Sequence, residues 1–260
     1  MDLSSTDLLA LPYIIAMHDA GATFTAAGSG WLVKTSAGEA FQFNEEDLCN
    51  GLSVVKERFV DNELDGFEVR DALVIDIGAH FGDSAVWFAK HGAKQIVAYE
   101  PFPTTAAVAA VSIRLNRLES RVKLNVLGVG GQSSRLQVPY DRRLSSTQSA
   151  RVASEGGVLG ESTQVDIVAF ADVVTDARTE GRTGNLAIKI DCEGCEEDIF
   201  AEPESWHALS LANRLVIEWH RPETLPGFLE QLRAVRFNYT TRATPNSTVI
   251  ILADRIEPPA

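Results

Sequence analysis

From Ala72 onward, short apolar runs alternate with segments whose apolar residues recur at steps of three and four, and this alternation restricts the chain to few folds. Leu73-Val74-Ile75 is the first such run, and Val108 and Val111 begin one such helical stripe. Strands that are apolar on both faces belong to parallel sheets, with helices on each side and right-handed crossovers. The sequence therefore predicts an α/β fold with a sheet covered on both faces.

The strands expected in this part of the chain run over residues 73–75, 95–99, 122–127, 186–191, 215–219, 237–241 and 248–253. The last two are close enough in sequence to form a hairpin, so the end of the sheet is expected to be antiparallel. Residues 139–162 are rich in Ser, Gly and Arg and lack periodicity. They predict an exposed insertion, either a lid whose arginines supply hydrogen-bond donors to the site or a passive linker.

Residues 1–70 lack this alternation and are expected to form a small N-terminal cap of helices and a hairpin. A helix is predicted over Leu8–Met17, a hairpin over Trp31–Phe43 and a second helix over Glu45–Asn62. The main domain is then expected to cover residues 71–260.

Charge disfavours one class of substrate. The 260-residue chain carries 36 acidic and 23 basic side chains, a formal net charge of −13. Such a surface repels phosphate backbones and anionic lipid unless a local basic patch intervenes. A nucleic-acid partner is therefore disfavoured.

Three cysteines, Cys49, Cys192 and Cys195, are too few for a disulfide scaffold, which favours a reducing compartment. The last two match C-x-x-C, but the intervening Glu193 opposes thiolate formation, so we interpret them as small packing residues rather than a redox dithiol. The N-terminus lacks the positive charge of a secretory leader, and the apolar run 8–17 is short and contains a proline. We therefore predict a cytoplasmic protein with no signal peptide and no membrane insertion.

A glycine-punctuated turn follows the first strand, in Asp76-Ile77-Gly78-Ala79-His80-Phe81-Gly82-Asp83-Ser84. Gly78 lets the backbone turn sharply and approach a ligand, and free N–H groups at the helix start favour a negatively charged group. The spacing departs from the G-x-G-x-x-G of nicotinamide sites. Asp76, just before the turn, is placed to hold a cationic amino group, so the pattern favours an amino-acid-bearing nucleoside over a dinucleotide. A tight turn without a ligand is the structural alternative.

The next strand ends in Tyr99-Glu100-Pro101-Phe102, with its carboxylate 18 residues after Gly82. Rossmann-type folds present an acid at about this distance, where it accepts both hydroxyl protons of a ribose diol. The alternative is that Glu100 is a solvated strand end or caps a helix. Together with the glycine turn, this residue predicts an adenosine-containing ligand.

Two later strands also end in acidic residues. Asp191 and Glu193 follow one of them, and Glu218 and His220 stand at the end of the next. Ligands in open α/β sheets bind beyond the carboxyl ends of the strands, so these four side chains should border the same cleft as the glycine turn. Lys189, inside its strand, is expected to pair with a carboxylate. For His220, a hydrogen-bonded structural role is the alternative to catalysis.

Four motifs, in their order along residues 71–254, resemble those of the FkbM-type family of S-adenosylmethionine-dependent methyltransferases. They are D-I-G-A-H-F-G-D-S, Y-E-P-F-P, K-I-D-C-E-G-C-E and I-E-W-H. The resemblance implies a Rossmann-like class I sheet of seven strands whose last strand is antiparallel, with S-adenosylmethionine as cofactor and S-adenosylhomocysteine as product. It also implies O-methyl transfer to a hydroxyl of a small-molecule or glycan acceptor: a sugar, a glycolipid or a natural-product-like compound.

The resemblance implies which residues bind the cofactor. The glycine turn matches the cofactor loop, Glu100 the ribose-binding acid and Phe102 a neighbour of the adenine. The predicted cofactor contacts are Asp76, Gly78, Ala79, His80, Gly82, Ser84, Glu100, Pro101, Phe102, Gly128 and Asp191. Gly128 lies in a glycine-rich run, 127–131, that departs from the family pattern.

Methyl transfer from a sulfonium is an in-line displacement that needs a base beside the acceptor oxygen. We predict His220 as that base, followed by Asp191, with Glu193 and Glu218 completing the catalytic group. A divalent ion held by these four side chains is a less favoured route, so no metal is predicted. Two other functions stay open: a nicotinamide-dependent oxidoreductase, favoured by Glu100, and a non-catalytic nucleoside-binding protein. No motif specifies the acceptor or the oligomeric state.

Overall fold

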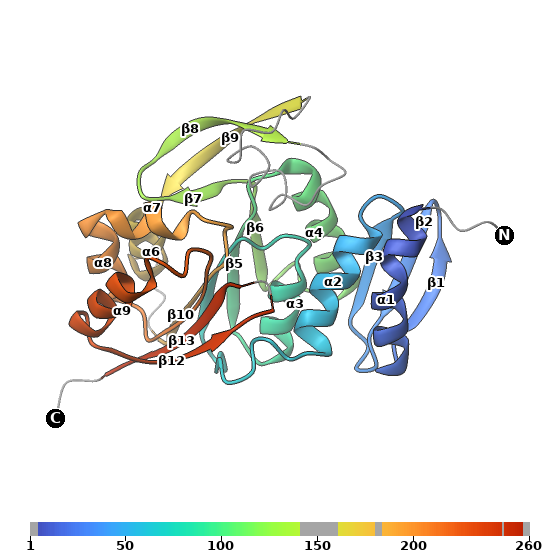
Figure 1. The fold of residues 1–260 in the computed structure, drawn as a ribbon, viewed down its shortest axis with the longest axis horizontal. Helices are drawn as coiled ribbons and strands as arrows, with labels where there is room; N and C mark the ends of the chain where they lie inside the picture. The colour runs from blue at the N-terminus through green and yellow to red at the C-terminus, as the bar shows by residue number, and fades with distance from the viewer. Residues whose placement is uncertain (1–4, 141–160, 180–183, 246, 257–260) are drawn as a thin grey trace.

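The computed structural model of the chain describes residues 5–140, 161–179, 184–245 and 247–256. Its centre is a seven-stranded sheet with the order β12-β13-β11-β10-β4-β5-β6 (Figure 1). The strands are β4 (Leu73–Ile77), β5 (Gln95–Tyr99), β6 (Val122–Asn125), β10 (Leu186–Ile190), β11 (Arg214–Trp219), β12 (Phe237–Ala243) and β13 (Val249–Arg255). The last strand, β13, runs antiparallel to both neighbours while the other pairs are parallel, which confirms the predicted sheet.

The register of the parallel strands brings their carboxyl ends to one edge of the sheet. Ile77 in β4 is paired with Tyr99 in β5 and with Ile190 in β10, and Ile190 is paired with Ile217 in β11. The residues that follow these positions directly are Gly78, Glu100, Asp191 and Glu218. The predicted meeting of the four motifs at one edge is therefore a consequence of strand pairing.

Helices cover both faces of the sheet (Figure 1). One face carries α2 (Leu48–Phe59), α3 (Asp83–Lys90) and α4 (Pro103–Leu115), and the other carries α6 (Phe170–Thr179), α7 (Glu196–Ala201), α8 (Pro203–Leu209) and α9 (Leu225–Ala234). Alternate residues of β4 serve the two layers: Val74 packs in the cluster that contains Trp87, and Ile75 in the cluster that contains Phe228. All five β4 residues are buried, which explains the continuous apolar run.

The N-terminal segment consists of α1 (Ser5–Asp19), a small sheet of β1 (Thr23–Ala27), β2 (Gly30–Lys34) and β3 (Ala40–Asn44), and then α2. The predicted hairpin is the pair β2 and β3, whereas β1 has no counterpart in the sequence prediction because most of its residues are exposed and give no apolar alternation. Phe43 is buried against Phe81, with ring centroids 5.6 Å apart. The segment thus shares a hydrophobic core with the main sheet.

The sequence prediction missed the strands that lie between residues 127 and 186. A third sheet stands there, of β7 (Gly128–Gly130), β8 (Ser134–Tyr140) and β9 (Glu161–Ala169), followed by α6 (Figure 1). The ends of the predicted insertion belong to β8 and β9, and its residues 141–160, with Arg142, Arg143 and Arg151, lie outside the described residues. The alternation of Val165 and Ile167 with polar neighbours is the signal that could have predicted β9.

Among the helices that the structure describes, none combines the length and the apolar character needed to span a bilayer.

Candidate active site

A cavity of about 920 Å³ lies at the carboxyl ends of the central strands, between α2 on one side and the third sheet on the other. The predicted site residues that line it are Gly78, His80, Glu100, Pro101, Phe102, Gly128, Asp191, Glu193 and Glu218. The other predicted residues lie behind this lining; they are Asp76, Ala79, Gly82, Ser84 and His220. The sheet therefore brings both predicted groups, cofactor-binding and catalytic, to one cavity.

Both glycines of the turn have a positive φ, and Gly78 also has no room for a side chain. Gly78 has a φ of +78°, and a Cβ at this position would stand 1.8 Å from the carbonyl oxygen of Asp191. Gly82 has a φ of +81° and directly precedes α3. The backbone N–H groups of Gly78 and Ala79 both donate to the carbonyl of Tyr99, at 3.0 and 2.9 Å. The turn is thus fixed to β5 and leaves its backbone against the cavity.

Asp76 supports this turn from the interior. Its side chain is fully buried, its Oδ2 accepts a hydrogen bond from Ser84 Oγ at 2.7 Å, and its Oδ1 is 3.5 Å from Lys189 Nζ. Burial raises the pKa of Asp76, against the effects of Lys189 and Ser84. Because it lies beneath the lining, its position favours a supporting role over the direct contact with a ligand amino group that the sequence predicts.

Glu100 joins the two loops at the other end of the cavity. Its Oε2 accepts the N–H of His80 and its Oε1 the N–H of Phe102, both at 3.0 Å. Burial raises the pKa of Glu100 to about 8, although both hydrogen bonds act in the opposite direction. Beside it, Val129, Val165 and Ile167 provide an apolar wall, and the last two were missed with β9.

Two buried cations border Asp191. Lys189 Nζ is 3.4 Å from Asp191 Oδ2 and donates to the Gly78 carbonyl at 2.6 Å, while Arg58 Nη2 is 3.5 Å from the same Oδ2. Burial alone would raise the pKa of Asp191, but Lys189 and Arg58 outweigh it and lower the pKa. Arg58 comes from α2 and was missed, because one arginine in a polar helix is typical of a solvated face.

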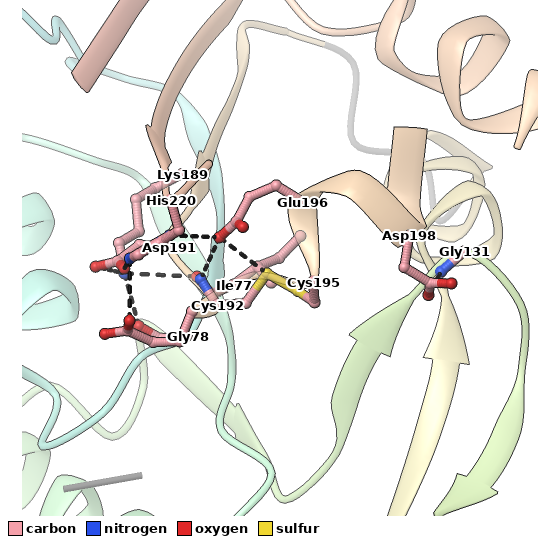
Figure 2. Close-up of a disulfide and its surroundings, with 11 residues drawn as sticks. Ile77, Gly78, Gly131, Lys189, Asp191, Cys192, Cys195, Glu196, Asp198 and His220 are labelled. Carbon is pink, nitrogen blue, oxygen red and sulfur yellow. Dashed lines mark hydrogen bonds and ion pairs between the residues drawn. A yellow bond between two sulfur atoms is a disulfide. The ribbon is translucent and has the colours of Figure 1, made fainter. Parts of the chain in front are cut away.

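His220 lies between two carboxylates, as Figure 2 shows for Glu196. Its Nδ1 is 3.1 Å from Glu196 Oε1 and its Nε2 is 3.0 Å from Glu193 Oε2. Burial lowers the pKa of His220, but Glu193 and Glu196 together raise it to about 11. Both ring nitrogens therefore carry protons at neutral pH and donate to carboxylates, which leaves no nitrogen free to act as the predicted base.

Glu218 has different surroundings. Its carboxylate lines the cavity, and its Oε1 accepts a hydrogen bond from Thr248 Oγ1 at 2.5 Å. Burial, and after it the charge of Asp191, raises the pKa of Glu218 to about 7. Of the four predicted catalytic residues, Glu218 thus combines a position on the cavity with a pKa near neutrality.

Cys192 and Cys195 form a disulfide at the edge of the same site (Figure 2). The prediction that they are separate packing residues is therefore wrong. The bond closes a turn in which Glu193 has a φ of +62° and Gly194 a φ of +107°, and Glu196 Oε1 accepts the N–H of Cys192 at 3.1 Å. It thus restrains the backbone that carries both carboxylate partners of His220.

One group in the described part of the chain has the spacing for a cation. Asp191, Glu193 and His220 each offer a ligand atom, all within 4.8 Å of one another. When His220 is protonated, the imidazolium itself neutralises the neighbouring carboxylate of Glu193. A divalent ion would have to displace the imidazole proton before it could bind.

This fold and cavity define a class: a Rossmann-like α/β protein with a nucleoside site at the carboxyl edge of its sheet. The family model for the methyltransferase FkbM domain matches residues 76–239, more than half of the chain. The chain therefore belongs to the FkbM methyltransferase family, as its motifs predict, and is an S-adenosylmethionine-dependent methyltransferase.

Several solved structures are similar in fold. A putative S-adenosylmethionine-dependent methyltransferase from Streptococcus mutans is 11% identical, with a TM-score of 0.49 over 88% of this chain and 56% of that one. An O-methyltransferase from Bacillus cereus, solved in complex with S-adenosylhomocysteine, is 14% identical, with a TM-score of 0.44 over 78% of this chain and 91% of that one. An O-methyltransferase family protein from Burkholderia thailandensis is 14% identical, with a TM-score of 0.46 over 81% and 59%. No protein of curated function matches the chain in sequence.

The residues around the cavity fit S-adenosylmethionine. Glu100 offers a buried carboxylate for ribose hydroxyls beside an apolar wall that suits a purine, and Gly78 lets the turn at the cavity edge pack directly against the backbone of Asp191. At the opposite end, Asp191 and Arg58 offer one charge of each sign to an amino-acid group. The donor set thus matches a nucleoside at one end and a zwitterion at the other.

Proposed function

We propose that the chain transfers the methyl group of S-adenosylmethionine to a hydroxyl oxygen of a sugar, a glycolipid or a natural-product-like small molecule. The observation that carries this proposal is the position of Glu218, which lines the same cavity as the cofactor residues. Its carboxylate already accepts a hydrogen bond from one hydroxyl, that of Thr248. Attack by a hydroxyl requires removal of its proton, and a carboxylate in this position can accept it.

The cofactor, when bound, supplies an electrophilic methyl group on a sulfonium. The chain must then position the acceptor in line and take up its proton. We assign proton removal to Glu218 instead of His220. His220, held by Glu193 and Glu196, fixes the geometry beside Glu218, from whose Oε1 its Nε2 is 3.9 Å away. Asp191, kept ionised by two cations, is assigned to the cofactor.

The predicted cofactor residues fall into two sets, those that line the cavity and those that do not. We assign contact with the cofactor to the residues that line the cavity: Gly78, His80, Glu100, Pro101, Phe102, Gly128 and Asp191. We assign support of the glycine turn to those beneath it: Asp76, Ala79, Gly82 and Ser84.

A polar face of α2 supports a hydroxylated acceptor. Asn50, Ser53 and Glu57 line the cavity at positions one, four and eight of a helical stripe. A helix that covers a cavity usually turns apolar residues inward, so this polar stripe favours a ligand with several hydroxyl groups. Ser53 Oγ donates a hydrogen bond to Glu57 Oε1 at 3.3 Å, and a ligand hydroxyl can join this pair.

The test is a methyl-transfer screen with S-adenosylmethionine labelled in its methyl group. Small sugars, glycolipids, hydroxylated natural products and RNA are compared in parallel, and the labelled product is analysed for the atom that carries the methyl group. We expect a methyl ether in at least one hydroxylated acceptor and no label on RNA. Label found only on nitrogen or carbon would refute O-methylation, label found only on RNA would refute the proposed acceptor class, and a Glu218→Gln variant that keeps full activity would refute the assigned base.

A further inference from the structure

Arg58 is a buried cation at the cavity, and it comes from outside the part of the chain that matches the family. It lies in α2, whereas the family match begins at residue 76. Its side chain is 5% exposed and lines the cavity. A guanidinium is rarely buried to this extent unless it binds a partner of opposite charge.

Lys189, the other buried cation at this end, already has its hydrogen-bonding capacity filled. Its Nζ donates to the carbonyls of Gly78 and Ile77 at 2.6 and 3.5 Å and is within 3.5 Å of both Asp76 and Asp191. An ammonium has three protons, so little capacity is left for a ligand.

Arg58 has donors to offer. Its Nη2 makes a long contact of 3.5 Å with Asp191, and its Nε lies 3.2 Å from Asp83 Oδ2 and its Nη1 beside Glu63. Nε and Nη1 are buried against those two carboxylates, so the N–H groups of Nη2, which make the one long contact, are the donors left for a ligand. A guanidinium has five N–H donors, and its planar fork matches a carboxylate.

The orientation of the cofactor follows from Glu100. Glu100 follows β5 and Asp191 follows β10, and these strands flank β4 on opposite sides, so if Glu100 binds the ribose, the amino-acid part of the cofactor lies toward Asp191 and Arg58. That part is a zwitterion, with an ammonium and a carboxylate. The pair of Arg58 and Asp191 presents complementary charges, joined by a contact of 3.5 Å.

We propose that Arg58 binds the carboxylate of the methionine part of S-adenosylmethionine while Asp191 binds its ammonium. The zwitterion then replaces one long ion pair with two, and the net charge of the site does not change. The N-terminal segment is on this account part of the cofactor site. The proposal rests on the cofactor site proposed above.

Three ligands separate this role from a structural one. They are S-adenosylhomocysteine, its decarboxylated analogue, which lacks only the carboxylate, and 5′-methylthioadenosine, which lacks the whole amino-acid group. Calorimetric titration of the full chain with each ligand measures the affinities. For Arg58→Gln we expect the affinity for S-adenosylhomocysteine to fall roughly 10- to 100-fold, the loss of charge-assisted hydrogen bonds. The affinities for the other two ligands should change by no more than about twofold.

Two further variants sharpen the result. Arg58→Lys keeps the charge but not the fork, so its loss for S-adenosylhomocysteine should be smaller than that of Arg58→Gln. Arg214→Gln removes a cation at the start of β11, one that pairs with Asp254 and does not line the cavity, and should leave all three affinities unchanged.

Equal losses for all three ligands in the Arg58→Gln variant would show that Arg58 only holds α2 in place and would overturn the proposal. An unchanged affinity for S-adenosylhomocysteine would overturn it as well, because the carboxylate would then bind elsewhere. Failure of the parent chain to bind either S-adenosylhomocysteine or 5′-methylthioadenosine would instead refute the cofactor site itself. The three-ligand comparison therefore distinguishes the two failures.

Discussion

The cofactor end and the acid-base end of the cavity are built in different ways. At the cofactor end, the part assigned to the ribose comes from one stretch, residues 76–102, in which backbone N–H groups of the turn donate hydrogen bonds to Tyr99 and Glu100. The acid-base end is assembled from segments far apart in sequence, with Glu218 and Thr248 brought together by the pairing of β11 with β13. Backbone geometry is therefore encoded locally, whereas proton chemistry depends on the whole sheet.

The largest effect should come from the acid-base end. Replacing the proposed base, Glu218→Gln, should lower the methyl-transfer rate by roughly a hundredfold to ten-thousandfold, because an amide cannot accept the acceptor proton. The affinity for S-adenosylhomocysteine should change by no more than about twofold. Steady-state rates at saturating cofactor, with an acceptor found by the screen, measure the first quantity, and calorimetry measures the second.

The same base predicts how the rate depends on pH. Glu218 must be ionised to accept a proton, and its pKa is about 7, so the rate should rise with pH up to about that value and then level off. His220, with a pKa of about 11, stays protonated over this range. A rate that follows ionisation near the ordinary histidine value in the Glu218→Gln variant would return the role of base to His220.

At the cofactor end, Glu100→Ala should reduce the affinity for S-adenosylhomocysteine by roughly 10- to 100-fold, because both hydrogen bonds proposed to the ribose hydroxyls are lost. The rate at saturating cofactor should fall far less than in Glu218→Gln. This pair of variants tests whether the two ends work separately. Similar losses of affinity and of rate in both variants would contradict the division.

A smaller effect is expected from the disulfide. A double variant, Cys192→Ser with Cys195→Ser, removes the closure of a short loop, worth about 2 kcal/mol in a chain-entropy estimate, and should lower Tm by about 4 to 8 °C. Cys49→Ser is the matched control and should leave Tm nearly unchanged. Thiol labelling of the untreated chain should find one reactive cysteine, and labelling of three would show that the bond does not form.

The last effect concerns the dependence of stability on pH. The pKa values of Glu100 and Glu218 are about 8 and 7 in the folded chain, against an ordinary value of 4.5. The folded state therefore binds these protons more tightly than the unfolded state, and this contribution to stability is lost as pH rises from about 4.5 to about 8. Thermal melts of ligand-free protein should show a smaller decrease over this range in a double variant, Glu100→Gln with Glu218→Gln. Equal decreases in parent and variant would contradict the raised pKa values.

The features that the sequence predicts are those encoded locally, in single strands and turns. The apolar run at Leu73–Ile77 predicts a central strand, and both faces of this strand are buried. The glycine turn predicts a sharp change of chain direction, and Gly78 has a φ of +78° with no room for a Cβ beside Asp191. The third sheet is absent from the prediction because β7 is only three residues long and β8 and β9 are separated by twenty residues in sequence.

Side-chain partners account for the rest of what the sequence could not predict. The motif that contains His220 predicts a base, but the charge of the imidazole depends on Glu196, which the fold brings to its Nδ1 from 24 residues away. Arg58 carries no local signal, because its burial results from packing of α2 against the main sheet. Such contacts require the tertiary structure.

The most direct test of the central claim is calorimetric titration of the ligand-free chain with S-adenosylhomocysteine and, separately, with NADH. We expect S-adenosylhomocysteine to bind with one molecule per chain, Glu100→Ala to weaken this binding and NADH to give no binding heat. Binding of NADH without binding of S-adenosylhomocysteine would contradict the account and favour an oxidoreductase.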